Sequence, residues 1–343
     1  MKKTITEGKA KIKSYKGKIS KKLPVFYNPV MEFNRTSTIL LLSALKKTNM
    51  QIALPLAGSG IRALRIIKEL PKNKIKKIYI NDYSEQAIKN IKENLKLNKI
   101  PHSKVSLSNT EANLFLLRSK GFDYIDIDPF GTPNPFLDSA VKRLARDSIL
   151  AVTATDTAAL CGTYPKACKR KYFAHNLKNP IMHEIALRIL IRKVQLIAAQ
   201  YERALTPIFS YSKNHYMRVF FLCKKSKKAT NEILKQHQMF NEYGPLWIGQ
   251  LWDKKITKEM SKKTNNPFIK TIYNESKLQT LGYYHIHKLC KAYKLKSPKT
   301  EKLFKEIKKQ GYKVVETHFT PLGVRSNIPL EKLIGIIKKL NKK

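Results

Sequence analysis

The residues best suited to chemistry are an acid and an aromatic in the segment Phe122-Asp123-Tyr124-Ile125-Asp126-Ile127-Asp128-Pro129-Phe130-Gly131. The apolar part predicts a buried strand, and the prolines and glycine that follow end it. Asp128 precedes a proline and is therefore extended, which holds its carboxylate at the end of the strand. Together with Phe130 it could stack a flat base and accept a hydrogen bond from an exocyclic amine. The alternative is a loop in which Asp128 caps a turn and Phe130 joins the core.

A second set of residues has the spacing of a nucleoside-binding half-sheet. Residues 51–56 predict a buried strand that leads into a glycine turn containing Gly58 and Gly60 and then a helix. Asp82 ends the next strand, 77–82, about 20 residues past the glycines. In nucleoside-binding folds a carboxylate at this spacing accepts hydrogen bonds from the ribose hydroxyls. Glu111 follows a third strand, where such folds carry a side chain for an adenine amino group. Each acid has a plainer alternative: a turn acid for Asp82, and a helix N-terminal acid for Glu111.

Strands and helices alternate through the first two thirds of the chain. A fifth strand is expected at 148–153, and an antiparallel pair at 207–211 and 216–223. This predicts an α/β fold with a doubly wound, mostly parallel, seven-stranded sheet. We expect one domain over 1–225, which begins with a hairpin extension at 4–27 that turns near Gly17. A smaller, Lys-rich α+β domain is expected over 226–343.

The charge of the chain points to a polyanionic partner. Lys and Arg number 68 against 24 Asp and Glu, a formal net charge of +44. Nucleic acid is the first candidate. A membrane surface is second, and it is disfavoured because no run approaches the ~18 to 20 apolar residues of a spanning helix. The segment 154–172 is predicted to be a loop that ends in a basic patch suited to a phosphate backbone, although a solvated surface is the alternative for each residue: Lys166, Lys169, Arg170 and Lys171.

The four cysteines are scattered and form no Cys-x-x-Cys pair, so neither a disulfide framework nor a zinc site is expected. The N-terminus lacks the apolar core of a signal peptide. We therefore expect a cytoplasmic protein.

Nine segments in both predicted domains resemble, in order, the archaeal and eukaryotic tRNA (guanine-26-N2) dimethyltransferases. They are 7–10, 26–31, 58–62, 126–133, 153–165, 183–184, 215–219, 244–247 and 323–329. The resemblance implies a Rossmann-like class I methyltransferase domain that uses S-adenosylmethionine, and a family-specific C-terminal domain that binds tRNA. It implies transfer of two methyl groups to the exocyclic amine of a guanine between the D stem and the anticodon stem.

The resemblance also assigns roles to individual residues. Asp128 matches the catalytic acid, and Phe26 and Phe130 match the pair that would sandwich the flipped guanine. The residues that match the family's cofactor contacts are Arg35, Arg62, Asp82, Glu111 and Ala112, and the glycine turn adds Gly58 and Gly60. The chain departs from the family at Leu54-Pro55, where an acid is common, and at Glu111, where Asp is common. Some relatives carry a C-terminal zinc site, which Cys223 and Cys290 cannot make, so no metal is expected.

Two other functions stay open from the sequence. Asp-Pro-aromatic also marks enzymes that methylate an amino group of adenine or cytosine, or guanine at another position, in RNA or DNA. A non-catalytic alternative is a basic RNA-binding module, disfavoured by the set Gly58, Gly60, Asp82, Asp128 and Phe130. A monomer is expected.

Overall fold

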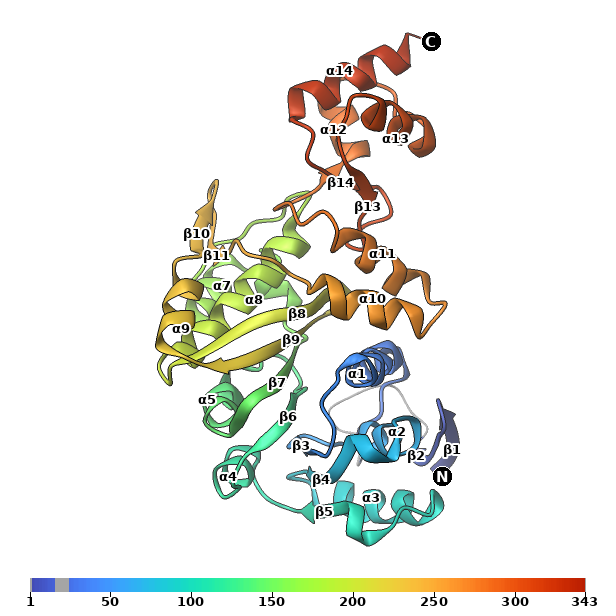
Figure 1. Cartoon of the computed structure of the whole chain (residues 1–343), viewed down its shortest axis with the longest axis vertical. Helices are drawn as coiled ribbons and strands as arrows, with labels where there is room; N and C mark the ends of the chain where they lie inside the picture. Colours follow the sequence, from blue (N-terminus) through green and yellow to red (C-terminus); the bar gives the residue numbers. More distant parts are fainter. Residues whose placement is uncertain (1, 16–24, 343) are drawn as a thin grey trace. The chain divides into compact units, whose positions relative to one another are not determined.

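The structure is a computed structural model that describes residues 2–15 and 25–342 (Figure 1). It contains a seven-stranded sheet in the order β5-β4-β3-β6-β7-β9-β8. The strands are β3 (Met50–Leu54), β4 (Ile75–Asn81), β5 (Val105–Ser108), β6 (Phe122–Ile127), β7 (Leu144–Ala154), β8 (Arg203–Lys213) and β9 (Tyr216–Lys225). Neighbours from β5 to β7 run parallel. Only two residues join β8 to β9, so these strands run in opposite directions. The predicted fold class is confirmed.

The central parallel strands carry buried apolar residues that point to both faces of the sheet, because helices cover both faces. Ile52, Ile78, Tyr124, Ile125 and Leu150 are fully buried. On one side of the sheet lie α1 (Glu32–Ala44), α2 (Ile61–Glu69) and α3 (Glu85–Leu97) (Figure 1). On the other lie α4 (Ala112–Leu117) and α5 (Asn134–Lys142). After β7 come α6 (Thr157–Leu160), α7 (Pro165–Tyr172) and α8 (Met182–Ala199), and α9 (Lys227–Leu234) follows β9.

The predicted loop at 154–172 is wrong for its basic part. Pro165 occupies the first turn of α7, where its missing N–H costs no hydrogen bond. The Lys-rich run then continues as a helix whose buried face holds Cys168 and Tyr172.

The N-terminal hairpin is confirmed, but its predicted turn is wrong. Strand β1 (Lys2–Glu7) pairs with β2 (Ala10–Tyr15) through a turn at Gly8-Lys9, with Gly8 at φ +53°. Gly17, where we placed the turn, lies outside the described residues. Two asparagine side chains, Asn94 in α3 and Asn98 at its C-cap, bind the free edge of β2. Asn98 and Asn94 accept from the backbone N–H groups of Lys11 and Lys13 at 2.9 and 2.8 Å.

The chain forms two compact units: one up to residue 155 with 194–206 and 218–235, and one with 156–193, 207–217 and 236 onward. The predicted domains, 1–225 and 226–343, stay predictions. The second unit contains the hairpin β10 (His237–Phe240) and β11 (Tyr243–Trp247), helices α10 (Lys254–Lys262) and α11 (Pro267–Glu275), and the small sheet β12 (Tyr284–His285), β13 (Val314–Glu316) and β14 (Gly323–Ser326). Helices α12 (Ile286–Ala292), α13 (Thr300–Lys309) and α14 (Leu330–Asn341) share a core with that sheet.

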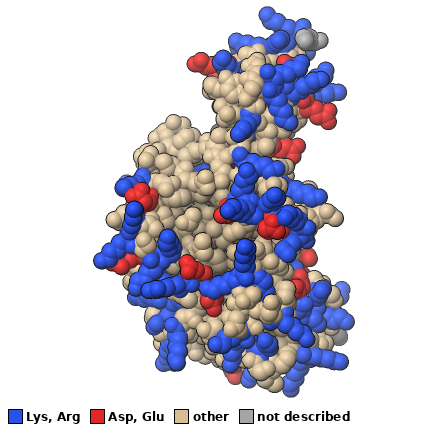
Figure 2. Space-filling model, in the orientation of Figure 1, with Lys and Arg blue, Asp and Glu red and all other residues tan. Residues whose placement is uncertain are grey.

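Over the part of the chain that the structure describes, no helix has the length and apolar character needed to cross a membrane. The same residues contain no cluster of His, Cys, Asp and Glu able to hold a metal ion. Lys and Arg side chains greatly outnumber acidic ones in the view of Figure 2.

Glu7 fastens the hairpin to two helices of the sheet layer. Its carboxylate, 3% exposed, accepts from Arg35 at 2.7 and 2.5 Å and from Arg65 at 3.0 Å. Burial raises the pKa of Glu7, but Arg35 and Arg65 outweigh burial and hold the pKa below its ordinary value.

Glu7→Gln should lower the free energy of unfolding by about 3–5 kcal/mol, because two buried guanidinium groups lose their shared counter-charge. This contribution of Glu7 is present above the ordinary pKa near 4.5 and is lost as the pH falls through the lowered folded pKa. Denaturant unfolding at several pH values measures it. Glu85→Gln, which breaks an exposed pair with Lys89, should cost at most about 1 kcal/mol. Equal losses in both variants would contradict the assignment.

Candidate active site at the carboxyl edge of the sheet

The order of the strands reverses next to β3. From β3 the chain steps outward through β4 and β5, and it then returns to the other side of β3 with β6 and continues to β7. In open α/β sheets ligands bind outside the carboxyl ends of the strands at such a reversal. The glycine turn follows β3 and Asp128 follows β6. The predicted nucleoside-binding residues and the predicted catalytic acid therefore lie on neighbouring strands at the same point of reversal.

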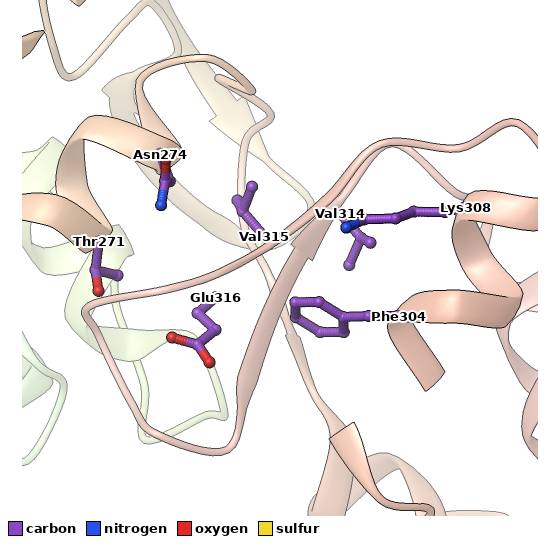
Figure 3. A pocket seen from close by; sticks show the side chains of 7 residues that line it. All are labelled: Thr271, Asn274, Phe304, Lys308, Val314, Val315 and Glu316. Carbon is purple, nitrogen blue, oxygen red and sulfur yellow. The ribbon is translucent and has the colours of Figure 1, made fainter. Parts of the chain in front are cut away.

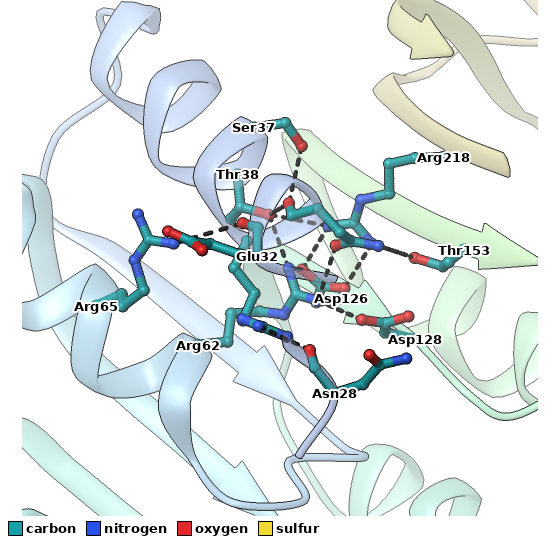
Figure 4. Close-up of polar contacts among 12 residues, drawn as sticks. Asn28, Glu32, Ser37, Thr38, Arg62, Arg65, Asp126, Asp128, Thr153 and Arg218 are labelled. Atoms are coloured by element: carbon teal, nitrogen blue, oxygen red, sulfur yellow. Dashed lines mark hydrogen bonds and ion pairs between the residues drawn. The ribbon is translucent and has the colours of Figure 1, made fainter. Parts of the chain in front are cut away.

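Asp128 lies directly after the buried strand β6 and keeps 21% of its side chain exposed. Its Oδ2 accepts a hydrogen bond from Arg62 in an ion pair (Figure 4). Arg62 also donates to Thr38 Oγ1 and to Asn34 Oδ1, each at 2.9 Å. The guanidinium is thus held by α1 while it fixes one oxygen of the carboxylate.

Phe26 and Phe130 are in direct contact. Their ring centroids are 4.2 Å apart and the ring planes meet at 69°, an edge-to-face pair. Phe130 is 45% exposed. A base cannot lie between rings this close, so the predicted sandwich requires the rings to separate.

The glycine turn and Asp82 form one hydrogen-bonded unit. The Gly58 N–H donates to Asp82 Oδ2 at 2.7 Å, and the Ser84 N–H donates to Oδ1 at 2.9 Å. Gly58 has φ +54°, and a Cβ there would lie 3.1 Å from the backbone oxygen of Phe26. Gly60, with φ +76°, is the N-cap of α2, and a Cβ there would lie 3.0 Å from Ile91. Both positions therefore require glycine.

Glu111 and Ala112 begin α4. The Glu111 side chain is exposed and accepts from the Leu114 N–H at 3.0 Å, which makes it the N-cap of the helix. This is the plainer role that the sequence left open, and it leaves further lone pairs of the carboxylate for a ligand. Ala112 is buried at the first helical position.

Arg35 does not join these groups through its side chain. It is buried and donates to Glu7 and, at 3.0 Å, to the backbone oxygen of Asn28. Sequence reasoning missed this pairing, since Glu7 and Arg35 lie in segments with no common local pattern.

A buried salt bridge beneath Asp128 was also missed. Arg218 on β9 is fully buried and donates to both oxygens of Asp126, at 2.8 and 2.7 Å. Asp126 in turn lies 3.4 Å from Arg62. The alternation of side-chain direction along β6 could have indicated that Asp126 belongs to the site. Residues two apart on a strand face the same side of the sheet, and Asp126 precedes Asp128 by two.

The four predicted phosphate contacts, Lys166, Lys169, Arg170 and Lys171, lie on α7 and are all exposed. Lys171 forms an ion pair with Asp156 at 3.3 Å. Tyr172, on the buried face, donates to the same carboxylate at 2.8 Å and so anchors the end of the helix.

A cavity of about 340 Å³ lies in the second unit (Figure 3). Phe304 and Lys308 of α13 and Glu316 of β13 line it, with Asn274 and Thr271 of α11. None of the residues predicted to do chemistry lines this cavity, and we assign it no role.

The mostly parallel seven-stranded sheet that ends in an antiparallel hairpin, with its glycine turn and strand-end acids, is the architecture of class I methyltransferases. The family N2,N2-dimethylguanosine tRNA methyltransferase matches residues 3–242 and 232–338. This chain belongs to that family.

Individual relatives agree with the family assignment. The tRNA (guanine(26)-N(2)/guanine(27)-N(2))-dimethyltransferase of Aquifex aeolicus is 38% identical, over 94% of this chain and 92% of its own. The tRNA (guanine(26)-N(2))-dimethyltransferase of Methanobrevibacter smithii is 37% identical over 99% and 98%. The solved complex of Trm1 from Pyrococcus horikoshii with S-adenosyl-L-methionine superposes with a TM-score of 0.89 at 32% identity, covering 97% of this chain and 99% of that one.

Asp82 should titrate above the ordinary aspartate pKa of 3.8, because burial raises its pKa and the backbone bonds from Ser84 and Gly58 only partly oppose it. A carboxyl ¹³C titration checks this, with the Asp82 signal assigned by its loss in Asp82→Asn. Titration at or below 3.8 would contradict the burial of this carboxylate.

Proposed function

We propose that this protein transfers two methyl groups from S-adenosylmethionine to the exocyclic N2 of guanine 26 in tRNA, with Asp128 as the catalytic acid residue. The observation that carries the proposal is the Asp128 carboxylate at the strand reversal, held by Arg62 on one oxygen and followed by the exposed ring of Phe130. Membership of the dimethylguanosine family and the named activities of full-length relatives support the substrate.

The residues around the glycine turn fit the methyl donor. Gly58 and Gly60 have no Cβ and so let a ligand approach the backbone closely. Asp82 accepts hydrogen bonds from two backbone N–H groups, and its remaining lone pairs can accept hydrogen bonds from ribose hydroxyls. Glu111 and Ala112 at the start of α4 would face the adenine, and Arg62 is a further proposed cofactor contact. Arg35 stays a proposed contact from the resemblance, although its side chain is paired with Glu7. When bound, S-adenosylmethionine supplies an electrophilic methyl group on a sulfonium sulfur.

Asp128 addresses the weak point of the reaction, the poor nucleophilicity of a guanine amine whose lone pair is delocalised into the ring. The carboxylate accepts a hydrogen bond from the amine, orients its lone pair, and takes or relays the proton that leaves when the amine gains a methyl group. Because Arg62 fixes Oδ2, the acceptor is already placed before substrate arrives, which is how positioning lowers a barrier.

Phe26 and Phe130 receive the base. Extruding guanine 26 from the tRNA costs a few kcal/mol. Stacking on an aromatic ring returns about 1–3 kcal/mol for a base. Since the two rings now touch, the base must displace at least one of them, and exposed Phe130 is the ring with room to move.

The chain's excess of basic residues and the exposed charges of α7 would bind the tRNA backbone. Such interactions give affinity that is not specific for sequence and that falls steeply with salt. The C-terminal part, rich in Lys, is proposed to bind tRNA as well. We also propose a monomer in the cytoplasm, where the four buried free cysteines would stay reduced.

The direct test uses labelled S-adenosylmethionine and two tRNA transcripts that differ only in guanine or adenine at position 26. Wild type should give mono- and dimethylguanosine from the guanine transcript alone. Asp128→Ala should lose roughly 10²–10⁴-fold in rate, the contribution of a positioned acid–base group, and Asp128→Asn less, because it keeps an acceptor oxygen. Product from the adenine transcript, or full activity of Asp128→Ala, would contradict the proposal.

Guanine 27 is a second candidate target, because the Aquifex aeolicus relative is named for both positions. A transcript with guanine at 27 and adenine at 26 distinguishes them. Label on that transcript would extend the substrate, and its absence would restrict the enzyme to position 26.

Replacing Lys166, Lys169 and Arg170 with alanine should raise KM for tRNA, with kcat unchanged. The salt dependence of binding should also flatten, by about one unit of slope for each phosphate that no longer has a cationic partner. Lys89, Lys142 and Lys262, each already paired with a carboxylate, supply a matched triple-alanine control. An equal effect in both triple variants would leave α7 without a specific role in binding.

A further inference from the structure

The Asp128 carboxylate is the last member of a row of alternating charges, which we call the charge ladder: Arg218, Asp126, Arg62 and Asp128 (Figure 4). Arg218 forks onto Asp126 at 2.8 and 2.7 Å, Asp126 lies 3.4 Å from Arg62, and Arg62 pairs with Asp128. The first three members are buried, and Asp128 alone reaches the surface.

We infer that Arg218 and Asp126 are positioning residues for the proposed reaction, because together they set how strongly Arg62 holds Asp128. This inference rests on the proposed function of Asp128. Neither residue was predicted as part of the site, and neither touches the position that substrate would occupy.

Asp126 divides its charge between two guanidinium groups. Its Oδ1 accepts from Arg218, and its Oδ2 accepts from Arg218 at 2.7 Å and from Tyr124 at 2.6 Å, with Arg62 farther away. Burial opposes ionisation of Asp126, but Arg218 and Arg62 outweigh it, so the pKa of Asp126 lies below its ordinary value. Arg218 is thus the main cationic partner of Asp126, so Arg62 can pair with Asp128.

The rest of Arg218 is held as firmly. It donates to Thr153 Oγ1 at 2.8 Å and to Thr38 Oγ1 at 3.0 Å, and Thr38 also accepts from Arg62. The ladder therefore ties β6, β7, β9 and α1 to one another around Asp126 (Figure 4). A buried ion pair adds little net stability, since desolvation offsets its attraction, so its main consequence here is fixed geometry.

Removing Arg218 has a specific consequence. In Arg218→Met, Asp126 keeps its charge and Arg62 is its only remaining cationic partner among the described residues. Arg62 should move toward Asp126 and release Asp128. The double variant Asp126→Asn/Arg218→Met removes both charges and leaves the Arg62–Asp128 pair intact. The double variant should therefore be more active than the single one, although it departs further from the wild-type sequence.

The experiment measures kcat and KM for the guanine-26 transcript, the Kd of S-adenosylmethionine by calorimetry, and Tm, for wild type and both variants. We expect kcat of Arg218→Met to fall by about 100-fold, the effect of a small misplacement of a reacting group, with KM for tRNA near its wild-type value. The Kd of S-adenosylmethionine should rise in the same variant, because Arg62 is also a proposed cofactor contact, and it should return toward the wild-type value in the double variant. The double variant should recover about tenfold of that loss, the size of a coupling between neighbouring residues. Arg218→Lys, which keeps the charge but not the fork, should lose less and serves if Arg218→Met does not fold.

Arg325→Met is the matched control, since Arg325 is equally buried and is also paired with buried carboxylates, in its case Glu184 and Glu275. It should lower Tm without lowering kcat of the folded enzyme. A double variant no more active than Arg218→Met, or an equal loss of kcat in Arg325→Met, would overturn the inference. Wild type and Asp128→Ala are measured in the same series. An inactive wild type would reject the proposed function. An active wild type with an unaffected Arg218→Met would reject only the positioning role of Arg218 and Asp126.

Discussion

The ion pair between Arg62 and Asp128 is the interaction on which the proposed active site depends. Asp128 lies where a strand ends, and among the residues that the structure describes only its Oδ2 has a partner, the Arg62 guanidinium, which also donates to Thr38 and Asn34. A carboxylate free on both oxygens would sample several rotamers, and one held on both would have fewer lone pairs open to a substrate. Binding Oδ2 alone fixes the carboxylate and leaves Oδ1 open, and the groups that do so belong to α1 and α2.

The sheet brings these groups together because the order of its strands reverses between β3 and β6. The glycine turn after β3 and the acid after β6 then share a crevice position, while Asp82, after β4, bonds the turn through Gly58. The backbone oxygen of Phe26 lies so near Gly58 that a side chain there would meet it. The aromatic pair and the glycine turn are therefore in contact, and a movement of the Phe26 backbone to admit a base would also displace the turn.

Much of this arrangement could be predicted from the sequence, since it is encoded locally. Buried strands, a glycine turn and acids at strand ends each lie within a few residues, and the spacing of Asp82 from Gly60 adds a longer constraint. The pairings of Glu7 with Arg35 and of Asp126 with Arg218 could not be predicted, since they join segments distant in the chain and local patterns carry no sign of a partner. The hairpin turn was misplaced because basic and apolar residues alternate past both Gly8 and Gly17. The sequence predicts a loop in place of α7 because the surface of this helix is almost wholly basic and only Cys168 and Tyr172 mark its buried face.

The central claim is that Asp128 engages the 2-amino group of the target guanine, and binding to a tRNA that lacks only this group tests it most directly. Affinities of wild type and Asp128→Ala would be measured, without methyl donor, for transcripts carrying guanine or hypoxanthine at position 26. Wild type should prefer guanine by roughly 1.5–3 kcal/mol, the range for a hydrogen bond to a charged group, and Asp128→Ala should bind both transcripts alike. An equal preference in the two proteins would mean that Asp128 does not contact the amine.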